Sequence, residues 1–228
     1  MTIPILLSVL LSYLVGSIPF GYLAGLTRGI DIRTVGSGNI GATNVFRTLG
    51  RKLGILTFVL DVLKGVAAVC VIPKCTWLLL APATVPPLYV LLLSAVAVMM
   101  GHSFPCFLSF RGGKGVATGL GIAIGLAPLT AFTALGLWIV VFALTRYVSV
   151  GSCIAAAYVA IAPWWLDNAA EPRGLVPGLL ALLGVLVIVK HRSNLKRLAA
   201  GTENRFCFTK KQLAERERKN AEKEAKNV

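Results

Sequence analysis

The chain has 228 residues, of which 56% are hydrophobic and only 14% are charged. Its apolar residues come in long runs and its mean hydropathy is +0.78, a pattern that excludes an ordinary soluble domain. In a bilayer every backbone polar group must be paired within the protein, and the short alternating segments of a β-barrel are absent from the sequence. The sequence therefore predicts an all-α membrane protein.

Seven apolar runs follow one another, at residues 4–27, 53–72, 76–100, 116–127, 128–145, 148–166 and 174–190. Most of them have the roughly 20 residues that a membrane span needs. The run 116–127 is short, and Pro128 separates it from the next run because proline interrupts helices. We expect seven transmembrane helices, with residues 1–205 forming the helical domain and residues 206–228 a charged cytoplasmic tail.

The distribution of Lys and Arg predicts the orientation. Seven spans place residues 28–52, 101–115, 146–147 and the tail on one side, and these segments hold most of the basic residues. The opposite side holds only Lys74 and Arg173. Because positive charge accumulates on the cytoplasmic side, we expect the N-terminus outside and the C-terminus in the cytoplasm. The net charge of +14 serves this topology, so nucleic acid is not an expected partner.

The first polar segment, residues 36–44, reads GSGNIGATN. Its glycines permit backbone angles that other residues avoid, so successive N–H groups can turn inward around an anion. The residues expected to bind phosphate here are Gly36, Ser37, Gly38, Asn39, Thr43, Asn44 and Arg47. The alternative is a flexible glycine turn between two helices.

The second polar segment, RGGKG, repeats this combination of flexible backbone and positive charge. It is not a Walker A loop, because Gly115 rather than Ser or Thr follows Lys114. Arg111, Gly112, Gly113, Lys114 and Gly115 are expected to hold a second phosphate. The alternative is a positively charged membrane anchor with a glycine hinge.

The two histidines, His102 and His191, each stand at a membrane boundary beside a polar segment. Neither begins the His-x-x-x-x-Asp pattern of many acyltransferases, and a Ser-His-Asp triad is hard to assemble. The cysteines show no paired spacing, so no metal site is expected. Asp61 and Lys64, three residues apart within a span, predict either a structural ion pair or a lysine that lines the polar site.

Six segments together resemble the bacterial membrane acyl-phosphate:glycerol-3-phosphate acyltransferases, the PlsY family. They are GSIPFGYL (16–23), GSGNIGATNVFRTLG (36–50), DVLKG (61–65), GHSFPCFLSFRGGKGVATGLG (101–121), RYVSVGS (146–152) and HRSNLKRLAAGTE (191–203). The resemblance covers about residues 4 to 205 and leaves the tail unexplained.

This resemblance implies seven transmembrane helices in the bacterial inner membrane, with the active site facing the cytoplasm. It implies transfer of a fatty acyl group from acyl phosphate to the 1-hydroxyl of sn-glycerol 3-phosphate, giving lysophosphatidic acid for phospholipid synthesis without a cofactor. The family's functional residues fall on Ser37 and Arg47, on the acyl-phosphate-binding residues Gly112, Gly113, Lys114 and Gly115, and on His191, Asn194 and Glu203.

Acyl phosphate is already activated, so we expect direct transfer without a covalent acyl-enzyme. Lys114 and Arg47 would supply positive charge, Ser37, Asn194 and Ser152 hydrogen-bond donors, and His191 an orienting contact to phosphate. Lys64, His102 and Glu203 are expected beside the substrates. The rival interpretations are an anion carrier and a structural membrane subunit.

Overall fold

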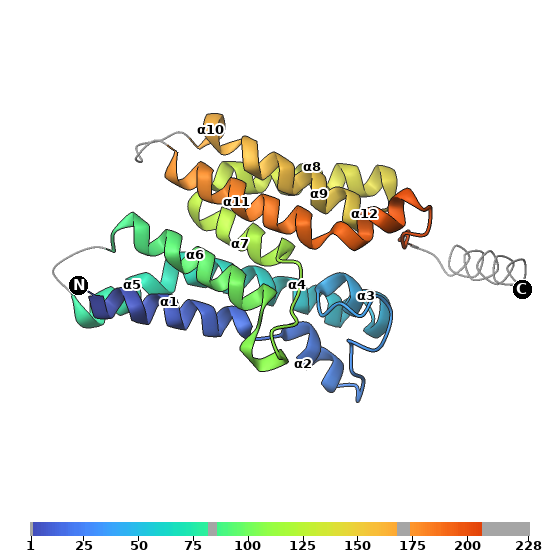
Figure 1. Ribbon diagram of the computed structural model, residues 1–228, viewed down its shortest axis with the longest axis horizontal. Helices are drawn as coiled ribbons and strands as arrows, with labels where there is room; N and C mark the ends of the chain where they lie inside the picture. The colour runs from blue at the N-terminus through green and yellow to red at the C-terminus, as the bar shows by residue number, and fades with distance from the viewer. Residues whose placement is uncertain (1, 82–85, 168–173, 207–228) are drawn as a thin grey trace, which may run out of the picture.

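The computed structural model describes residues 2–81, 86–167 and 174–206, and every regular element within these ranges is a helix. The elements are α1 (Thr2–Ser17), α2 (Phe20–Leu26), α3 (Ala42–Leu49), α4 (Arg51–Val66), a π-helical turn (Ala67–Val71), α5 (Ile72–Leu80), α6 (Leu88–Ser103), a 3-10 turn (Cys106–Leu108), α7 (Val116–Leu126), α8 (Pro128–Thr145), α9 (Val148–Ile161), α10 (Pro163–Leu166), α11 (Leu175–Lys190) and α12 (Arg192–Ala199). Figure 1 shows the long helices side by side along the longest axis of the molecule. The prediction of an all-α protein is confirmed for the described residues.

Four helical segments of the described chain are long and apolar enough to cross a membrane: Thr2–Leu26, Arg51–Leu80, Leu88–Leu108 and Pro128–Thr145. A fifth is added when α11 and α12, which meet at a bend of 51°, are counted as one span. The helices α7 and α9 are apolar but shorter. These helices support a membrane protein, whereas the crossing of all seven runs and their orientation stay predictions.

The predicted break between the second and third runs is wrong. The second helical segment does not end at residue 72 but continues through the π-helical turn to Leu80, so Lys74 lies within a helix rather than in a loop. Pro73 stands in the first turn of α5, where its missing N–H is tolerated. The predicted break at Pro128 is confirmed, because α7 ends at Leu126 and α8 begins at Pro128.

Glycines bring pairs of helices into close contact. A Cβ atom added to Gly16 of α1 would lie 2.4 Å from the carbonyl oxygen of Val98 in α6, and one added to Gly65 of α4 would lie 2.3 Å from that of Thr118 in α7. Gly184 of α11 packs in the same way against α9. Small residues at such crossings let the helices of membrane proteins approach closely. The long helices therefore form a closely packed frame for the loops at their ends.

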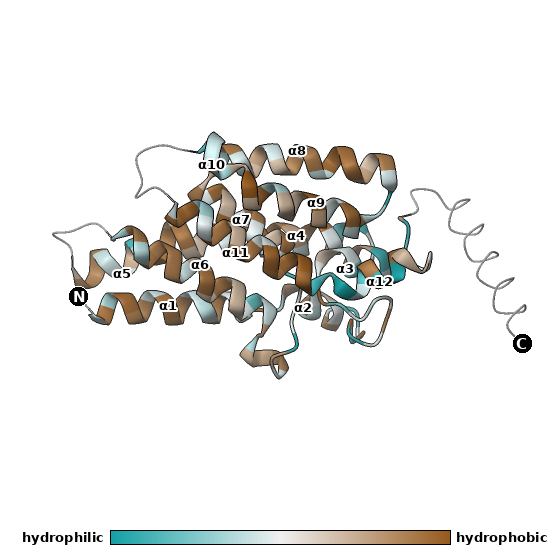
Figure 2. Cartoon of the chain, turned by 45° about the horizontal axis from the view of Figure 1, so that its top comes forward, coloured by the Kyte–Doolittle hydropathy of each residue, from teal (hydrophilic) through white to brown (hydrophobic). Residues whose placement is uncertain are grey.

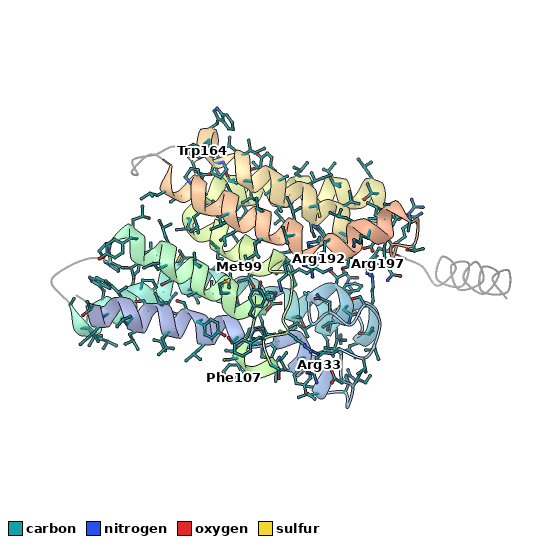
Figure 3. All side chains as sticks on the ribbon, in the orientation of Figure 1. Arg33, Met99, Phe107, Trp164, Arg192 and Arg197 are labelled. Carbon is teal, nitrogen blue, oxygen red and sulfur yellow. The ribbon has the colours of Figure 1, made fainter. Side chains whose placement is uncertain are left out.

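The polar parts of the chain collect at one end of this frame. Figure 2 shows hydrophilic residues on α3, α12 and the adjoining loops, while the long helices are mainly hydrophobic. In Figure 3, Arg33 and Arg197 lie toward this end, and Trp164 lies toward the opposite end. The fold thus places polar segments that are far apart in the sequence at the same end of the bundle.

Candidate functional site

The first polar loop is held in shape by Asn44, in the first turn of α3. Its side-chain oxygen accepts a hydrogen bond from the backbone N–H of Ser37 at 2.9 Å, and its amide nitrogen donates to the carbonyls of Ile32 and Val35, each at 3.1 Å. Gly36 lies against this amide with a φ of +62°, and a Cβ atom there would be 2.3 Å from the Asn44 oxygen. The buried Asn44 therefore shapes the loop through its backbone.

Lys114 begins a hydrogen-bonded chain that joins the second polar segment to a third, residues 190–205, which reads KHRSNLKRLAAGTENR. Its ammonium group donates to the side-chain oxygen of Asn194 in α12. The amide nitrogen of Asn194 donates in turn to Oε1 of Glu203 at 2.7 Å. Ser149 of α9 donates to the same carboxylate oxygen at 2.8 Å, and Arg197 donates to Oε2 at 2.9 Å. Side chains from α9, from α12 and from the loops that carry Lys114 and Glu203 therefore meet in one array of ammonium, amide and carboxylate groups.

Charge in this array is set by burial and by hydrogen bonds. Burial lowers the pKa of Lys114 to about 8, while the nearby Glu203 carboxylate opposes this effect. Burial alone would raise the pKa of Glu203, but hydrogen bonds from Asn194, Ser149 and Arg197 outweigh it and hold that pKa below its usual value. At neutral pH Lys114 is therefore largely a cation and Glu203 an anion.

Arg47 of α3 reaches the same end of the molecule from the first polar segment. Its guanidinium group donates to the backbone carbonyl of Asn204 at 3.0 Å, one residue after Glu203. Its Cζ atom also lies 5.7 Å from the ring centroid of Phe206. The contacts of Arg47, Lys114 and Glu203 thus connect all three polar segments.

Of the remaining candidates, His191 contacts this array, whereas Ser152 and Asn39 make their hydrogen bonds elsewhere. His191 stands buried at the bend between α11 and α12, with Nδ1 2.8 Å from the carbonyl oxygen of Val187, and its own carbonyl accepts from the backbone N–H of Asn194 at 2.8 Å.

The hydroxyl of the buried Ser152 accepts a hydrogen bond from the indole N–H of Trp138 at 3.3 Å. Asn39 accepts from the backbone N–H of Gly41 within its own loop at 2.7 Å, Thr43 is half-buried, and Arg111 is exposed.

A second polar cluster supports the RGGKG loop. Lys64 Nζ lies 2.7 Å from Oδ1 of Asp61 and donates to the carbonyl of Ile18 at 3.2 Å, and His102 Nδ1 lies 3.7 Å from the same Asp61 oxygen. The backbone N–H of Gly113 donates to the His102 carbonyl at 3.0 Å, and a Cβ atom at Gly113 would be 2.2 Å from His102 Nε2. Asp61, Lys64 and His102 also line a narrow pocket. The predicted Asp61–Lys64 ion pair is confirmed.

Sequence reasoning missed three contributors to the site: Ser149, Arg197 and the backbone of Asn204. Ser149 and Arg197 both lie in segments that carry the family resemblance, and that was the available signal for them. Their positions in the sequence do not predict a contact with Glu203. Ser149 is 54 positions away, and Arg197 reaches Glu203 across the turn that follows α12. A backbone carbonyl such as that of Asn204 leaves no trace in a sequence.

The fold and the site define a helical membrane protein with a cationic, hydrogen-bonded site at one end of its bundle. Within the described residues, no three His, Cys, Asp or Glu side chains gather as metal ligands would. Residues 6–201 match the sequence model of the family described as glycerol-3-phosphate acyltransferase. The chain therefore belongs to the glycerol-3-phosphate acyltransferase family, as the motifs predicted.

Individual relatives agree with this assignment. The chain is 48% identical over 195 residues to the glycerol-3-phosphate acyltransferase of Geobacter sulfurreducens, covering 86% of this chain and 94% of the relative. It is 46% identical over 207 residues to that of Desulforudis audaxviator, covering 90% and 98%.

Two solved structures have the same fold. Both are crystal structures of PlsY, an integral membrane glycerol 3-phosphate acyltransferase, and both are 37% identical to this chain. The glycerol 3-phosphate form has a TM-score of 0.76 and covers 89% of this chain and 96% of that chain. The lysophosphatidic acid form has a TM-score of 0.73, with 89% and 95% covered.

Proposed function

We propose that this protein transfers a fatty acyl group from acyl phosphate to the 1-hydroxyl of sn-glycerol 3-phosphate and so forms lysophosphatidic acid. The observation that carries the proposal is the chain of hydrogen bonds from Lys114 through Asn194 to Glu203, which holds a partly buried cation at the polar end of the bundle. The similar PlsY structures, described as glycerol 3-phosphate and lysophosphatidic acid forms, support the acceptor and the product.

In the proposed reaction the 1-hydroxyl oxygen attacks the acyl carbonyl carbon. The new ester C–O bond forms while the C–O bond to phosphate breaks, and the hydroxyl proton passes to the departing phosphate. No protein base and no covalent acyl-enzyme are then needed. Lys114 and Arg47 stabilise the negative charge that collects on the phosphate groups, because a fixed cation in a site with little water is strongly effective.

Donors around these cations orient the substrates. Ser152 accepts a hydrogen bond from Trp138, so its own hydroxyl proton stays available for a substrate oxygen. Ser37, whose backbone N–H is bonded to Asn44, would supply its hydroxyl as a further donor. Asn194 and Glu203 hold Lys114, with His191 beside them at the helix bend.

The other predicted binding residues act mainly on the backbone of the two loops. In the first loop these are Gly36, Gly38, Asn39, Thr43 and Asn44. In the second, Gly112 and Gly113 allow close packing on His102, and Gly115, at the N-cap of α7, has a φ of +81°. Lys64 and His102 support this loop from the bundle, and the exposed Arg111 attracts anionic substrates to it.

We also propose that all seven runs cross a bacterial inner membrane, with the N-terminus outside and the site facing the cytoplasm. The collection of polar loops at one end of the bundle supports this arrangement. In intact cells, a membrane-impermeant thiol reagent should label Trp165→Cys but not Arg33→Cys, each placed in a cysteine-free variant. Labelling of Arg33→Cys before the cells are permeabilised would contradict the orientation.

The acyl chain is proposed to lie in an apolar groove of about 330 Å³, lined by Ile18, Pro19, Tyr22, Leu23, Phe107 and Leu108. The groove shares Ile18 and Pro19 with the narrow pocket that His102 lines. His102 contacts Gly113, the residue before Lys114, so the groove approaches the proposed phosphate site. An acyl chain could therefore extend from the site along the bundle surface.

Substitution Leu23→Trp should lower kcat/KM for palmitoyl phosphate about tenfold, because the larger ring fills the groove. Transfer from hexanoyl phosphate, whose chain is too short to occupy the whole groove, should change by about twofold at most. Leu6→Trp, at an exposed position of α1, is the matched control. Equal losses for the two donors would show that the groove does not hold the chain.

The pH dependence should report the ionisation of Lys114. Since the unliganded lysine has a pKa of about 8, it is a cation below that pH and neutral above it. Substrate phosphates are dianionic well above their second pKa of about 6, so kcat/KM should fall about tenfold per pH unit above pH 8. Lys114→Arg keeps its positive charge at high pH, so its kcat/KM should not fall above pH 8. If kcat/KM of Lys114→Arg falls above pH 8 as it does in the unmodified protein, the fall is due to another ionising group.

The activity itself is tested with the purified protein in detergent. Palmitoyl phosphate and glycerol 3-phosphate are supplied, and lysophosphatidic acid is measured by mass spectrometry. A second reaction with palmitoyl-CoA in place of palmitoyl phosphate tests which acyl donor the protein uses. We expect product from the phosphate donor alone, whereas a protein that only transports anions makes no product with either donor.

A further inference from the structure

The described chain ends in residues 202–206, which follow α12 and are here called the closing segment. It lies beyond residues 6–201, the part that matches the family's sequence model, although its Glu203 still belongs to the HRSNLKRLAAGTE motif. The segment carries Glu203, which accepts the hydrogen bonds described above. Its last described residue, Phe206, donates its backbone N–H to the carbonyl of Arg146 at 2.8 Å. The segment is therefore tied to the helical bundle near both of its ends.

The ring of Phe206 belongs to a row of aromatic side chains. Its centroid lies 5.3 Å from that of Phe46 in α3 and 5.4 Å from that of Phe142 in α8. Phe142 stacks on Trp138 with a centroid distance of 5.0 Å. Because Trp138 in turn bonds Ser152, the row connects α3 with α9 through the closing segment.

Arg47 is the residue on which these contacts act. It follows Phe46 in α3, its guanidinium lies over the ring of Phe206, and it donates to the carbonyl of Asn204. A guanidinium is attracted to the face of an aromatic ring, and the carbonyl fixes the direction of one N–H group. A long side chain that is already held in place loses less freedom when a ligand binds.

We propose that Phe206 is a positioning residue for the acyl-transfer reaction and acts through Arg47. The inference rests on the proposed function, in which Arg47 stabilises phosphate. It adds that a residue outside the family match holds this guanidinium ready for the substrate. Phe206 itself need not touch either substrate.

The test compares Phe206→Ala, Phe206→Leu and Phe206→Tyr in the full-length protein. The first two remove the aromatic ring and should lower kcat/KM for glycerol 3-phosphate about fivefold to tenfold, mainly by raising KM. Phe206→Tyr keeps the ring and should stay within about twofold of the unmodified protein. Leucine preserves apolar volume, so the melting temperature of Phe206→Leu should stay close to that of the unmodified protein. Phe132→Ala, at an exposed position of α8, is the control and should change neither quantity.

Combination with Arg47→Ala separates this inference from the proposed function. The double variant Arg47→Ala/Phe206→Leu should be no slower than Arg47→Ala, because the ring acts only through the guanidinium. Full activity of Arg47→Ala would show that the proposed role of Arg47 is wrong. If Arg47→Ala is slow but Phe206→Leu is fully active, or if the two losses multiply, the positioning role of Phe206 is overturned and the proposed function stands.

Discussion

Replacing Lys114 with alanine is expected to lower kcat/KM for acyl transfer about a hundredfold or more, because a partly buried, fixed cation is a large source of transition-state stabilisation. The side chain is held by Asn194 at the start of the chain of bonds that leads to Glu203, so its removal takes away the cation at the end of this chain. The measurement is the initial rate of lysophosphatidic acid formation from palmitoyl phosphate by the purified variant.

Two further variants make this result specific. Lys114→Arg keeps the charge and should retain part of the activity, although its planar group differs in shape. Arg28→Ala removes an exposed cation outside the site and should change the rate by about twofold at most, since exposed charges are screened by solvent. Near-normal transfer by Lys114→Ala, with an unchanged melting temperature, would remove this cation from the proposed mechanism.

Replacing Asp61 with leucine should destabilise the protein by about 3–5 kcal/mol, because it leaves the Lys64 ammonium buried without its carboxylate. In the intact structure the two groups lie 2.7 Å apart, with side-chain exposures of only 3% and 4%. The loss should appear as a lower melting temperature in detergent. The RGGKG loop should also loosen, since it contacts the cluster through His102.

The double variant Asp61→Leu/Lys64→Met tests the physical cause. Removing both charges should recover most of the stability, because two apolar side chains can replace a buried ion pair at little cost. A double variant as unstable as Asp61→Leu would contradict the explanation by an unpaired charge and point to packing instead. If Asp61→Leu alone were as stable as the unmodified protein, the ion pair would contribute nothing measurable.

The all-helical fold could be predicted because long apolar runs leave the backbone little alternative in lipid. The meeting of the polar segments could be predicted as well, since each follows an apolar run and the runs place them on the same side. The end of the second helical segment could not. The Pro73–Lys74 pair breaks the hydropathy pattern without breaking the helix, because proline is compatible with a first helical turn.

The role of an individual side chain was harder to predict than the part of the fold in which it lies. The polar side chain of Asn44 suits ligand binding, but its three side-chain hydrogen bonds are all made with the loop backbone. The sequence places Phe206 at the start of the charged tail, because nothing in it indicates that this ring reaches Phe46. Residues 207–228, the rest of that predicted tail, lie outside the described residues. Such contacts depend on how the chain returns after α12, which no local pattern encodes.

Asn194 has a consequence for how the site treats negative charge. A carboxylate placed directly on Lys114 would form a closed ion pair and compete with any incoming anion. Here a neutral amide separates the two charges, offering its oxygen to the ammonium and its nitrogen to the carboxylate. The lysine is thereby kept in place while its charge stays only partly satisfied. In the proposed reaction, an arriving phosphate group would supply the negative charge that Lys114 does not receive from the neutral amide of Asn194.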